Sequence, residues 1–284
     1  MSLKVFAIGD LHGRFQPIRD FHLRHNTNKE YNKANKYMIL LGDAGLNYYL
    51  DSRDKTFKKK LSKYPFTYFV IRGNHEERAS NIARNNPDWQ FESFWGNLVL
   101  VEKEFPNIKY AMDYPTFYAI PYVKIPYFLR DDNPNTGDIE HEDLIDYWKT
   151  WVIPGAYSVD KDYRLTMGYS WFKDEQLTEE EKDCFLHDMS TIGYDCDFVL
   201  SHTCPCCFEP TDLFLPMVDQ STVDKSMEQF LEHVEFLLDY KCWLWGHYHT
   251  FRDYPRTDGT KKIMLMHEVI DLEQVYKEDT VELL

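Results

Sequence analysis

The stretch TYFVIRGNHE, residues 67–76, joins an apolar run to a cluster of polar side chains. Residues 67–71 are aromatic, β-branched and almost entirely apolar, which is typical of a strand buried on both faces. The residues that follow are an arginine, a glycine, an asparagine, a histidine and a glutamate, and they predict a turn that carries ligand-binding groups. The rest of the chain repeats this arrangement.

Four more apolar runs end in polar clusters. KVFAI (4–8) precedes GDLHG, YMILL (37–41) precedes GDAG, DFVL (197–200) precedes SH, and CWLW (242–245) precedes GHYH. Helical periodicity is present over 14–25, 53–64, 179–190 and 227–238. Thr178 followed by Glu181 is the pattern of a capping box at the start of the third of these helices. Strands alternating with helices predict an α/β fold with a largely parallel sheet.

Other parts of the chain are less regular. Residues 98–120 predict short antiparallel strands, and Asp258-Gly259 between two extended runs predicts a hairpin. Residues 121–150 are rich in proline, asparagine and aspartate and then become helix-like. We expect this segment to be an excursion near the site, within a single domain that spans residues 1–284.

Composition and charge narrow the range of partners. Hydrophobic residues make up 43% of the chain and aromatic residues 16%, as in a globular protein. The net charge of −15 disfavours a nucleic-acid polymer as partner. No apolar run approaches the roughly 20 residues of a membrane span. The N-terminus has the pattern of a first strand and not of a signal peptide, so we expect a cytoplasmic protein with reduced cysteines and no membrane partner.

The polar clusters share one position, because each follows the carboxyl end of a predicted strand. Ligands of open α/β sheets bind at that edge. The side chains expected to converge there are Asp10, His12, Asp43, Asn74, His75, His202, His247 and His249. Carboxylate, imidazole and amide groups suit a divalent ion such as Mn, Fe or Zn. Without His75 the set holds seven ligands, which fits a pair of ions bridged by one carboxylate better than a single ion with an open position.

The sequence resembles the calcineurin-like metallophosphoesterases. That family carries Asp-x-His, Gly-Asp, Gly-Asn-His-Glu/Asp, a lone His and Gly-His-x-His, and this chain has GDLHG, GDAG, GNHE, SH and GHYH in the same order across residues 9–249. The resemblance implies a four-layer αββα sandwich of two mixed β-sheets flanked by helices. It also implies hydrolysis of a phosphate monoester or diester, on a small molecule or a phosphoprotein, by a hydroxide that bridges two metal ions.

The resemblance also assigns roles to the motif residues. One ion would be held by Asp10, His12, Asp43 and His249. The other would be held by Asp43, Asn74, His202 and His247, so that Asp43 bridges the pair. His75 would protonate the leaving oxygen, with Asp10 as its supporting carboxylate.

Two segments bear on substrate binding. The second motif reads GDAGLNYY and lacks the arginine with which phosphoprotein phosphatases extend it, so Arg14, Arg72 or Arg78 is a candidate to replace that charge. We place Arg78 among the substrate-binding candidates. The segment GAYSVDKDYR, residues 155–164, resembles one found in a subset of bacterial and phage members. Its candidates for the substrate side are Ser158, Asp160 and Arg164, and the alternative is a structured turn.

Other functions of the same fold stay open as alternatives. One alternative is a nuclease, which the acidic charge of the chain disfavours because its substrate is a polymer. Another is a dinucleotide or cyclic-nucleotide phosphodiesterase. A non-catalytic metal-binding scaffold is disfavoured because His75 and every ligand are present. Cys204, Cys206 and Cys207 lie in SHTCPCC, residues 201–207, which has no second C-x-x-C to complete a zinc site. We therefore expect a loop that carries His202.

Overall fold

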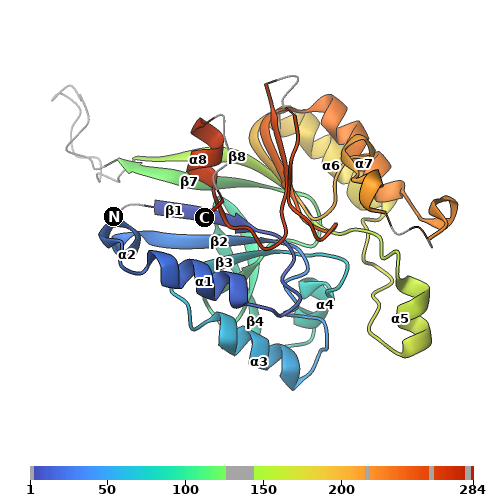
Figure 1. The fold of residues 1–284 in the computed structure, drawn as a ribbon, viewed down its shortest axis with the longest axis horizontal. Coiled ribbons are helices and arrows are strands. Elements are labelled where there is room, and N and C mark those ends of the chain that lie inside the picture. The colour runs from blue at the N-terminus through green and yellow to red at the C-terminus, as the bar shows by residue number, and fades with distance from the viewer. Residues whose placement is uncertain (1–2, 126–143, 215, 217, 256–258, 279–282) are drawn as a thin grey trace.

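Two mixed β-sheets pack face to face, and helices cover both outer surfaces (Figure 1). The computed structural model of the protein describes residues 3–125, 144–214, 216, 218–255, 259–278 and 283–284. The arrangement confirms the expected four-layer αββα sandwich. In the part of the chain that is described, no helix is long and apolar enough to cross a membrane.

The first sheet is built mainly from the N-terminal half of the chain. Its parallel centre is formed by β1 (Leu3–Ile8), β2 (Asn35–Leu41), β3 (Thr67–Ile71) and β6 (Ile108–Tyr110). Antiparallel strands flank it: β4 (Trp89–Phe94), β5 (Asn97–Glu102) and β13 (Ile270–Asp271). The order is β13-β1-β2-β3-β6-β5-β4. Helices α1 (Gln16–His25) and α3 (Ser52–Leu61) bury Ile18, Phe21 and Leu61 against its outer face.

The second sheet holds β7 (Thr116–Ile125), β8 (Leu144–Ile153), β9 (Asp195–Ser201), β10 (Asp239–Trp245), β11 (Arg252–Asp253) and β12 (Lys261–Met264). Its order is β11-β12-β10-β9-β8-β7, and the four inner strands are parallel. Helices α6 (Glu179–Ile192) and α7 (Ser226–Leu237) pack on its outer face. The capping box of Thr178 and Glu181 begins α6, as predicted.

Four short α-helices are also present: α2 (Lys29–Lys33), α4 (Ala79–Ala83), α5 (Lys161–Met167) and α8 (Leu272–Lys277). The described residues also form three 3₁₀ helices: η2 (Cys206–Phe208), η3 (Thr211–Leu213) and η4 (Gln220–Thr222). In Figure 1, α5 stands away from both sheets at the lower right. The segment that carries it was expected from sequence to adjoin the site.

Side chains from the two sheets interdigitate to form the central core. The first sheet contributes Ile39, Leu41 and Phe69, and the second contributes Trp148, Leu200 and Leu244. All six are at most 2% exposed. Since alternate residues of a strand point to opposite faces, the neighbours of these residues pack under the outer helices.

The helix-like pattern expected towards residue 150 is wrong. Residues 144–153 form β8, in which Trp148 lies in the core between the sheets and Trp151 lies in the core under α6 and α7. Two tryptophans three positions apart would share one side of a helix, whereas in a strand they point to opposite faces. The sequence here is rich in aromatic and β-branched residues, which suits a strand.

The described parts of the segment expected to be an excursion near the site, residues 121–125 and 144–150, belong to β7 and β8. Strand β8 runs parallel to β9, so its start at Leu144 and the end of β7 at Ile125 lie far from the carboxyl end of β9. Residues 126–143 lie outside the described residues. The assignment of the chain to one domain stays a prediction.

The strands expected within 98–120 exist but are not one antiparallel unit. β5 pairs with β6 in antiparallel fashion, β6 pairs with β3 in parallel fashion, and β7 belongs to the second sheet. The predicted hairpin is present as β11 and β12, which pair antiparallel around Gly259. Asp258 lies outside the described residues.

We expect Ile39→Ala, in the core between the sheets, to lower the free energy of unfolding by roughly 2–5 kcal/mol, because it leaves a cavity that its neighbours fill only in part. Chemical denaturation monitored by circular dichroism measures this loss. The control is Phe236→Ala on α7, whose side chain is 83% exposed, and it should shift stability by less than about 0.5 kcal/mol. Equal effects of the two substitutions would contradict this assignment of the core.

Candidate metal centre and adjoining cavity

The polar clusters predicted from sequence meet at one edge of the sandwich. Asp10, Asp43 and Asn74 follow β1, β2 and β3 of the first sheet, and His202 and His247 follow β9 and β10 of the second. The carboxyl ends of parallel strands lie at the same edge of a sheet, which explains how residues so distant in sequence converge.

Four side chains make a first group of ligand atoms: Asp10, His12, Asp43 and His249. Their nitrogen and oxygen atoms all lie within 4.8 Å of one another. The Nε2 atoms of His12 and His249 are 2.9 Å apart, and His12 Nε2 is 3.8 Å from Asp43 Oδ2. This group matches the first metal site that the sequence predicts.

Asn74, His202 and His247 form a second group that adjoins Asp43. Asn74 Oδ1 lies 2.9 Å from His202 Nε2 and 3.2 Å from His247 Nδ1. His202 Nε2 is also 3.6 Å from Asp43 Oδ1. Asp43 is therefore next to both groups, as a bridging carboxylate must be.

Hydrogen bonds show that lone pairs of the second group face one another. His202 Nδ1 lies 2.8 Å from the carbonyl oxygen of Leu41, which can only accept, so Nδ1 carries the proton and Nε2 does not. Asn74 Nδ2 donates to Ser158 Oγ at 2.9 Å, which leaves Asn74 Oδ1 as the atom that meets His202 Nε2. Two acceptors this close repel each other unless a cation lies beside them, so the donor set fits a divalent metal ion.

The two aspartates add buried negative charge to the same place. Asp10 is fully buried, and burial followed by the charge of Asp43 raises its pKa. Burial also opposes the ionisation of Asp43, but His75, His202 and His12 outweigh it and hold the pKa of Asp43 below its ordinary value. Asp10 Oδ1 has no hydrogen-bond partner among the residues that the structure describes. A cation would stabilise both carboxylates.

Burial keeps the histidines of the second group neutral. It is the main cause that lowers the pKa of His202 and, more strongly, that of His247. Neutral imidazole is the form that binds metal ions, so the pocket holds these side chains in the competent protonation state.

His75 lies beside the metal ligands without joining either group. Its backbone N–H donates to Asp43 Oδ1 at 2.9 Å, and its ring Nε2 is 3.9 Å from Asp43 Oδ2. Sequence analysis named Asp10 as the carboxylate that supports His75, but the structure places Asp43 there. Asp10 Oδ2 instead accepts the backbone N–H of His247 at 2.7 Å.

Two of the expected substrate-binding residues lie behind Asn74. Ser158 Oγ accepts from Asn74 Nδ2 and Arg164 Nη1 and lies 2.5 Å from Glu175 Oε2, to which it donates. Ser158 and Arg164 are 1% and 2% exposed, and neither lines the cavity described below. They orient the oxygen of Asn74, and of the three candidates in this segment Asp160 alone reaches the cavity.

Two of the three arginines named from sequence, Arg72 and Arg78, have structural partners. Arg78 makes a two-pronged ion pair with Glu181 and donates to the carbonyl oxygens of Asp174 and Gln176, so it fixes the start of α6 and does not face the metal ligands. Arg72 is buried and donates to the carbonyl oxygen of Glu175 at 2.7 Å. The guanidinium group of Arg78 is satisfied by protein acceptors and is therefore poorly placed to clamp phosphate, whereas Nε and Nη2 of the buried Arg72 have no hydrogen-bond partner among the described residues.

Glu76 is a supporting residue whose role sequence reasoning missed. It is 3% exposed and accepts the backbone N–H groups of Gly45 and Leu46 at 3.0 and 3.2 Å, which ties the loop after β2 to the loop after β3. Burial raises its pKa to about 7. The sequence signal that could have indicated this role is the position of Glu76 at the end of the GNHE motif.

The backbone at the candidate site adopts a conformation that side chains usually avoid. His12, Asp43, His247 and His249 have φ values of 46°, 47°, 69° and 53°. The left-handed region is costly for residues with a Cβ and clusters at functional sites, where surrounding structure enforces it. Here these turns aim four ligand side chains at one point.

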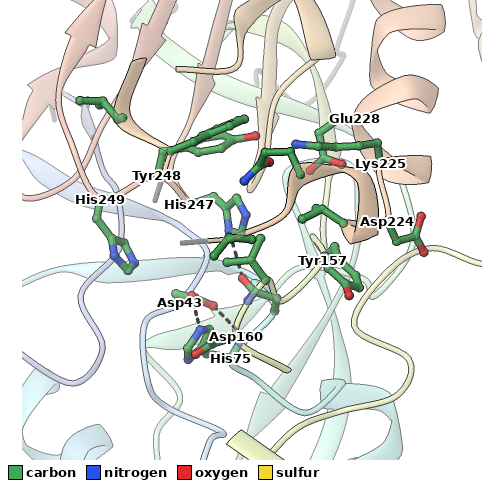
Figure 2. A pocket seen from close by; sticks show the side chains of 17 residues that line it. Asp43, His75, Tyr157, Asp160, Asp224, Lys225, Glu228, His247, Tyr248 and His249 are labelled. Atoms are coloured by element: carbon green, nitrogen blue, oxygen red, sulfur yellow. Dashed lines mark hydrogen bonds and ion pairs between the residues drawn. The ribbon is translucent and has the colours of Figure 1, made fainter. Parts of the chain in front are cut away.

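A cavity of about 440 Å³ opens beside the ligands (Figure 2). Its lining includes Asp43, Asn74, His75, His247 and His249. The other lining residues are Tyr157, Val159, Asp160, Leu213, Phe214, Val218, Gln220, Val223, Asp224, Lys225, Glu228 and Tyr248. A smaller cavity of about 200 Å³, lined by His12, Tyr48, Tyr49, Phe57 and His75, lies on the other side of His75. Sequence analysis named Asp160 among the residues that line the larger cavity, but the lining residues between 213 and 228 carried no motif and were not found.

The three clustered cysteines are not activated thiols. Burial raises the pKa of Cys204 far above its ordinary value, that of Cys206 to about 12 and that of Cys207 to about 11. Each is a free cysteine. Such groups stay protonated at neutral pH, which disfavours redox chemistry or metal binding through sulfur.

Comparisons with known proteins support the same assignment. The family model of the calcineurin-like phosphoesterases matches residues 3–251. A search of the curated proteins gives no significant match.

Solved structures share the fold at low sequence identity. The protein TT1561 of Thermus thermophilus is 12% identical, with a TM-score of 0.53 over 100% of this chain and 98% of its own. A dimetal phosphatase from Danio rerio is 11% identical, with a TM-score of 0.50 over 95% of this chain and 92% of its own. At this identity the likeness shows the fold alone.

We expect Gly42→Ala to disrupt the centre, because a Cβ at Gly42 would lie 2.0 Å from His202 Nδ1. The control is Gly168→Ala, since Gly168 also has a positive φ but a Cβ there meets nothing within 4 Å. Both variants bear the backbone cost of a left-handed alanine, roughly 1–2 kcal/mol, so their difference isolates the clash. Metal content after dialysis should fall in Gly42→Ala and persist in Gly168→Ala. Equal retention in the two variants would contradict a metal-binding role for His202 as placed here.

Proposed function

Because this chain belongs to the calcineurin-like phosphoesterase family, we propose that it hydrolyses phosphate esters with two bound divalent ions. The observation that carries the proposal is the pair of ligand groups joined at Asp43, in which the donor atoms of Asn74 and His202 face each other as acceptors. Mn, Fe and Zn all suit this set of ligands.

In this proposal Asp10, His12, Asp43 and His249 hold one ion, and Asp43, Asn74, His202 and His247 hold the other. When bound, the two ions activate a water molecule as the nucleophile and neutralise the phosphoryl oxygens. The Ser158–Asn74 hydrogen bond keeps an amide oxygen towards the ion pair, and that ligand adds no negative charge. The centre therefore stays attractive to phosphate in an acidic protein.

His75 is the group that we propose to give a proton to the leaving oxygen. It lines both cavities, so it meets a leaving group on either side of the ligands. As water forms a new bond to phosphorus, the bond from phosphorus to the leaving oxygen breaks, and the proton of His75 passes to that oxygen. The products are an alcohol and inorganic phosphate for a monoester, and an alcohol and a phosphate monoester for a diester.

The cavity favours a small substrate over a polymer. Its volume falls within the range of ligand pockets for small molecules. The chain has a net charge of −15, which opposes the approach of a nucleic-acid backbone. A monoester or diester of a small alcohol is therefore the substrate that we propose.

Removal of the metal ions tests the centre directly. We expect about two ions per chain in protein purified without chelator, loss of phosphatase activity after treatment with a chelator, and recovery on addition of Mn²⁺. Asp43→Asn should lower the occupancy of both positions because its carboxylate adjoins both groups. Metal analysis by mass spectrometry measures the ratio, and one ion per chain at full activity would rule out the two-ion proposal.

The role of His75 predicts a dependence on the leaving group. His75→Ala should bind metal as before and lose roughly 10²-fold or more in kcat on alkyl phosphates, whose leaving oxygen needs a proton. The loss should be smaller on 4-nitrophenyl phosphate, whose leaving group departs unprotonated. His233→Ala, an exposed histidine on α7, is the control and should match the wild type. An equal loss on both substrates would refute the assigned role.

A further inference from the structure

A buried carboxylate oxygen without a partner lies in the wall of the larger cavity. Glu228, on α7, is 3% exposed. Its Oε1 accepts from Thr203 Oγ1 at 2.9 Å, whereas its Oε2 has no hydrogen-bond partner among the described residues. Native structures seldom leave a buried acceptor unpaired, and such an atom calls for a donor from a ligand or a water molecule.

Glu228 lies across the cavity from Asp43 and His75. In Figure 2, Tyr248, Glu228 and Lys225 lie above the ligand His247, and Asp43 and His75 lie below it. A phosphoryl group held at the centre would therefore direct its leaving group towards Glu228.

The space between these walls is largely apolar. It is lined by Tyr157, Val159, Leu213, Phe214, Val218 and Val223. Apolar walls with a few polar groups at defined points are typical of sites for small organic molecules. An aromatic or aliphatic body fits this part of the cavity, and a short sugar-like or fully charged one does not.

The remaining charges in the far wall already have partners. Lys225 Nζ pairs with Glu209 Oε1 at 2.5 Å, so its charge is neutralised within the protein. Asp224 accepts from the backbone N–H of Ser226 and from Gln176 Nε2. Asp160 is 3.7 Å from Arg164 Nη1. Among the described carboxylates of this wall, Glu228 is the one with a buried oxygen that lacks a partner.

Since no free cation lines the far wall in the described part of the chain, a second phosphate or a carboxylate on the substrate would be repelled there. A group that donates a hydrogen bond would instead meet Glu228 Oε2. Burial raises the pKa of Glu228 to about 7, because the carboxylate lacks solvent, and an ammonium group would supply the missing stabilisation.

We propose that this cavity selects a phosphate ester of a small alcohol with an apolar body and a hydrogen-bond donor at its far end, an amine above all, which binds Glu228 Oε2. The inference rests on the proposed function and adds the class of substrate. It favours small molecules over phosphoproteins, and it excludes substrates that carry a second anionic group on the leaving side.

Three aryl phosphates with similar scissile bonds test the proposal: 4-(aminomethyl)phenyl, 4-methylphenyl and 4-(carboxymethyl)phenyl phosphate. With the Mn²⁺-loaded enzyme, kcat/KM from phosphate release should be greatest for the amine and least for the carboxylate. A charged hydrogen bond supports a difference of about tenfold or more between the amine and the methyl compound. Equal rates, or a preference for the carboxylate, would overturn the proposal.

Matched variants assign the preference to one residue. Glu228→Gln keeps the size of the side chain and should abolish the preference for the amine. Glu232→Gln removes the same charge from an exposed position of α7 and should retain that preference. Retention of the preference in a folded Glu228→Gln protein, as judged by thermal unfolding, would overturn the assignment.

Binding of the leaving group alone separates this proposal from the hydrolytic function. Calorimetry should show that 4-(aminomethyl)phenol binds more tightly than 4-methylphenol to the wild type, and equally to Glu228→Gln. If none of the esters is hydrolysed but the amine still binds through Glu228, the proposed hydrolysis fails and the cavity assignment stands. If the esters are hydrolysed but the amine is preferred neither in turnover nor in binding, the proposed hydrolysis stands and the cavity assignment fails.

Discussion

Two buried carboxylates placed side by side are the constraint on which this structure depends. Asp10 and Asp43 follow neighbouring parallel strands and are almost completely shielded from water. Like charges this deep in a protein are tolerated only with compensation, which here can come from the surrounding histidines or from bound cations. The histidines would meet that need only as cations, since it is the charge of His75, His202 and His12 that lowers the pKa of Asp43. Burial lowers the pKa of His202 and of His247, and the compensation for these carboxylates therefore falls to a metal ion.

The supporting structure explains how such a costly arrangement is held together. Glu76 links two of the ligand-bearing loops, Ser158 fixes the amide of Asn74, and the carbonyl oxygen of Leu41 fixes the tautomer of His202. Each contact restrains a ligand through a group that does not itself face the centre. Orientation of ligands by such partners is a general requirement of metal sites, because it sets both the direction and the basicity of the donor atoms.

The sequence predicted the parts of this architecture that are local. Strand ends such as 67–76 combine an apolar run and its ligands in one contiguous stretch, so periodicity and composition were enough to place Asn74 at a sheet edge. Contacts between segments that are distant in sequence could not be predicted from local patterns. Nothing near Ser158 indicates that it bonds a side chain 84 positions earlier, and nothing near Arg78 indicates Glu181 as its partner. The strand at 144–153 was misjudged because its two tryptophans serve different cores, which only the packing of both sheets reveals.

The placement of β7 and β8 separates changes at their connected ends from changes at the edge that carries the metal ligands. Their connected ends, Ile125 and Leu144, lie at the edge opposite the ligands, and their pairing is anchored by a long antiparallel register. Changes at that end lie far from the ligands, so the geometry of the ligand edge does not depend on them. A fold of this kind lets evolution, or a protein engineer who attaches a reporter, alter the far end of the sandwich without disturbing the metal ligands.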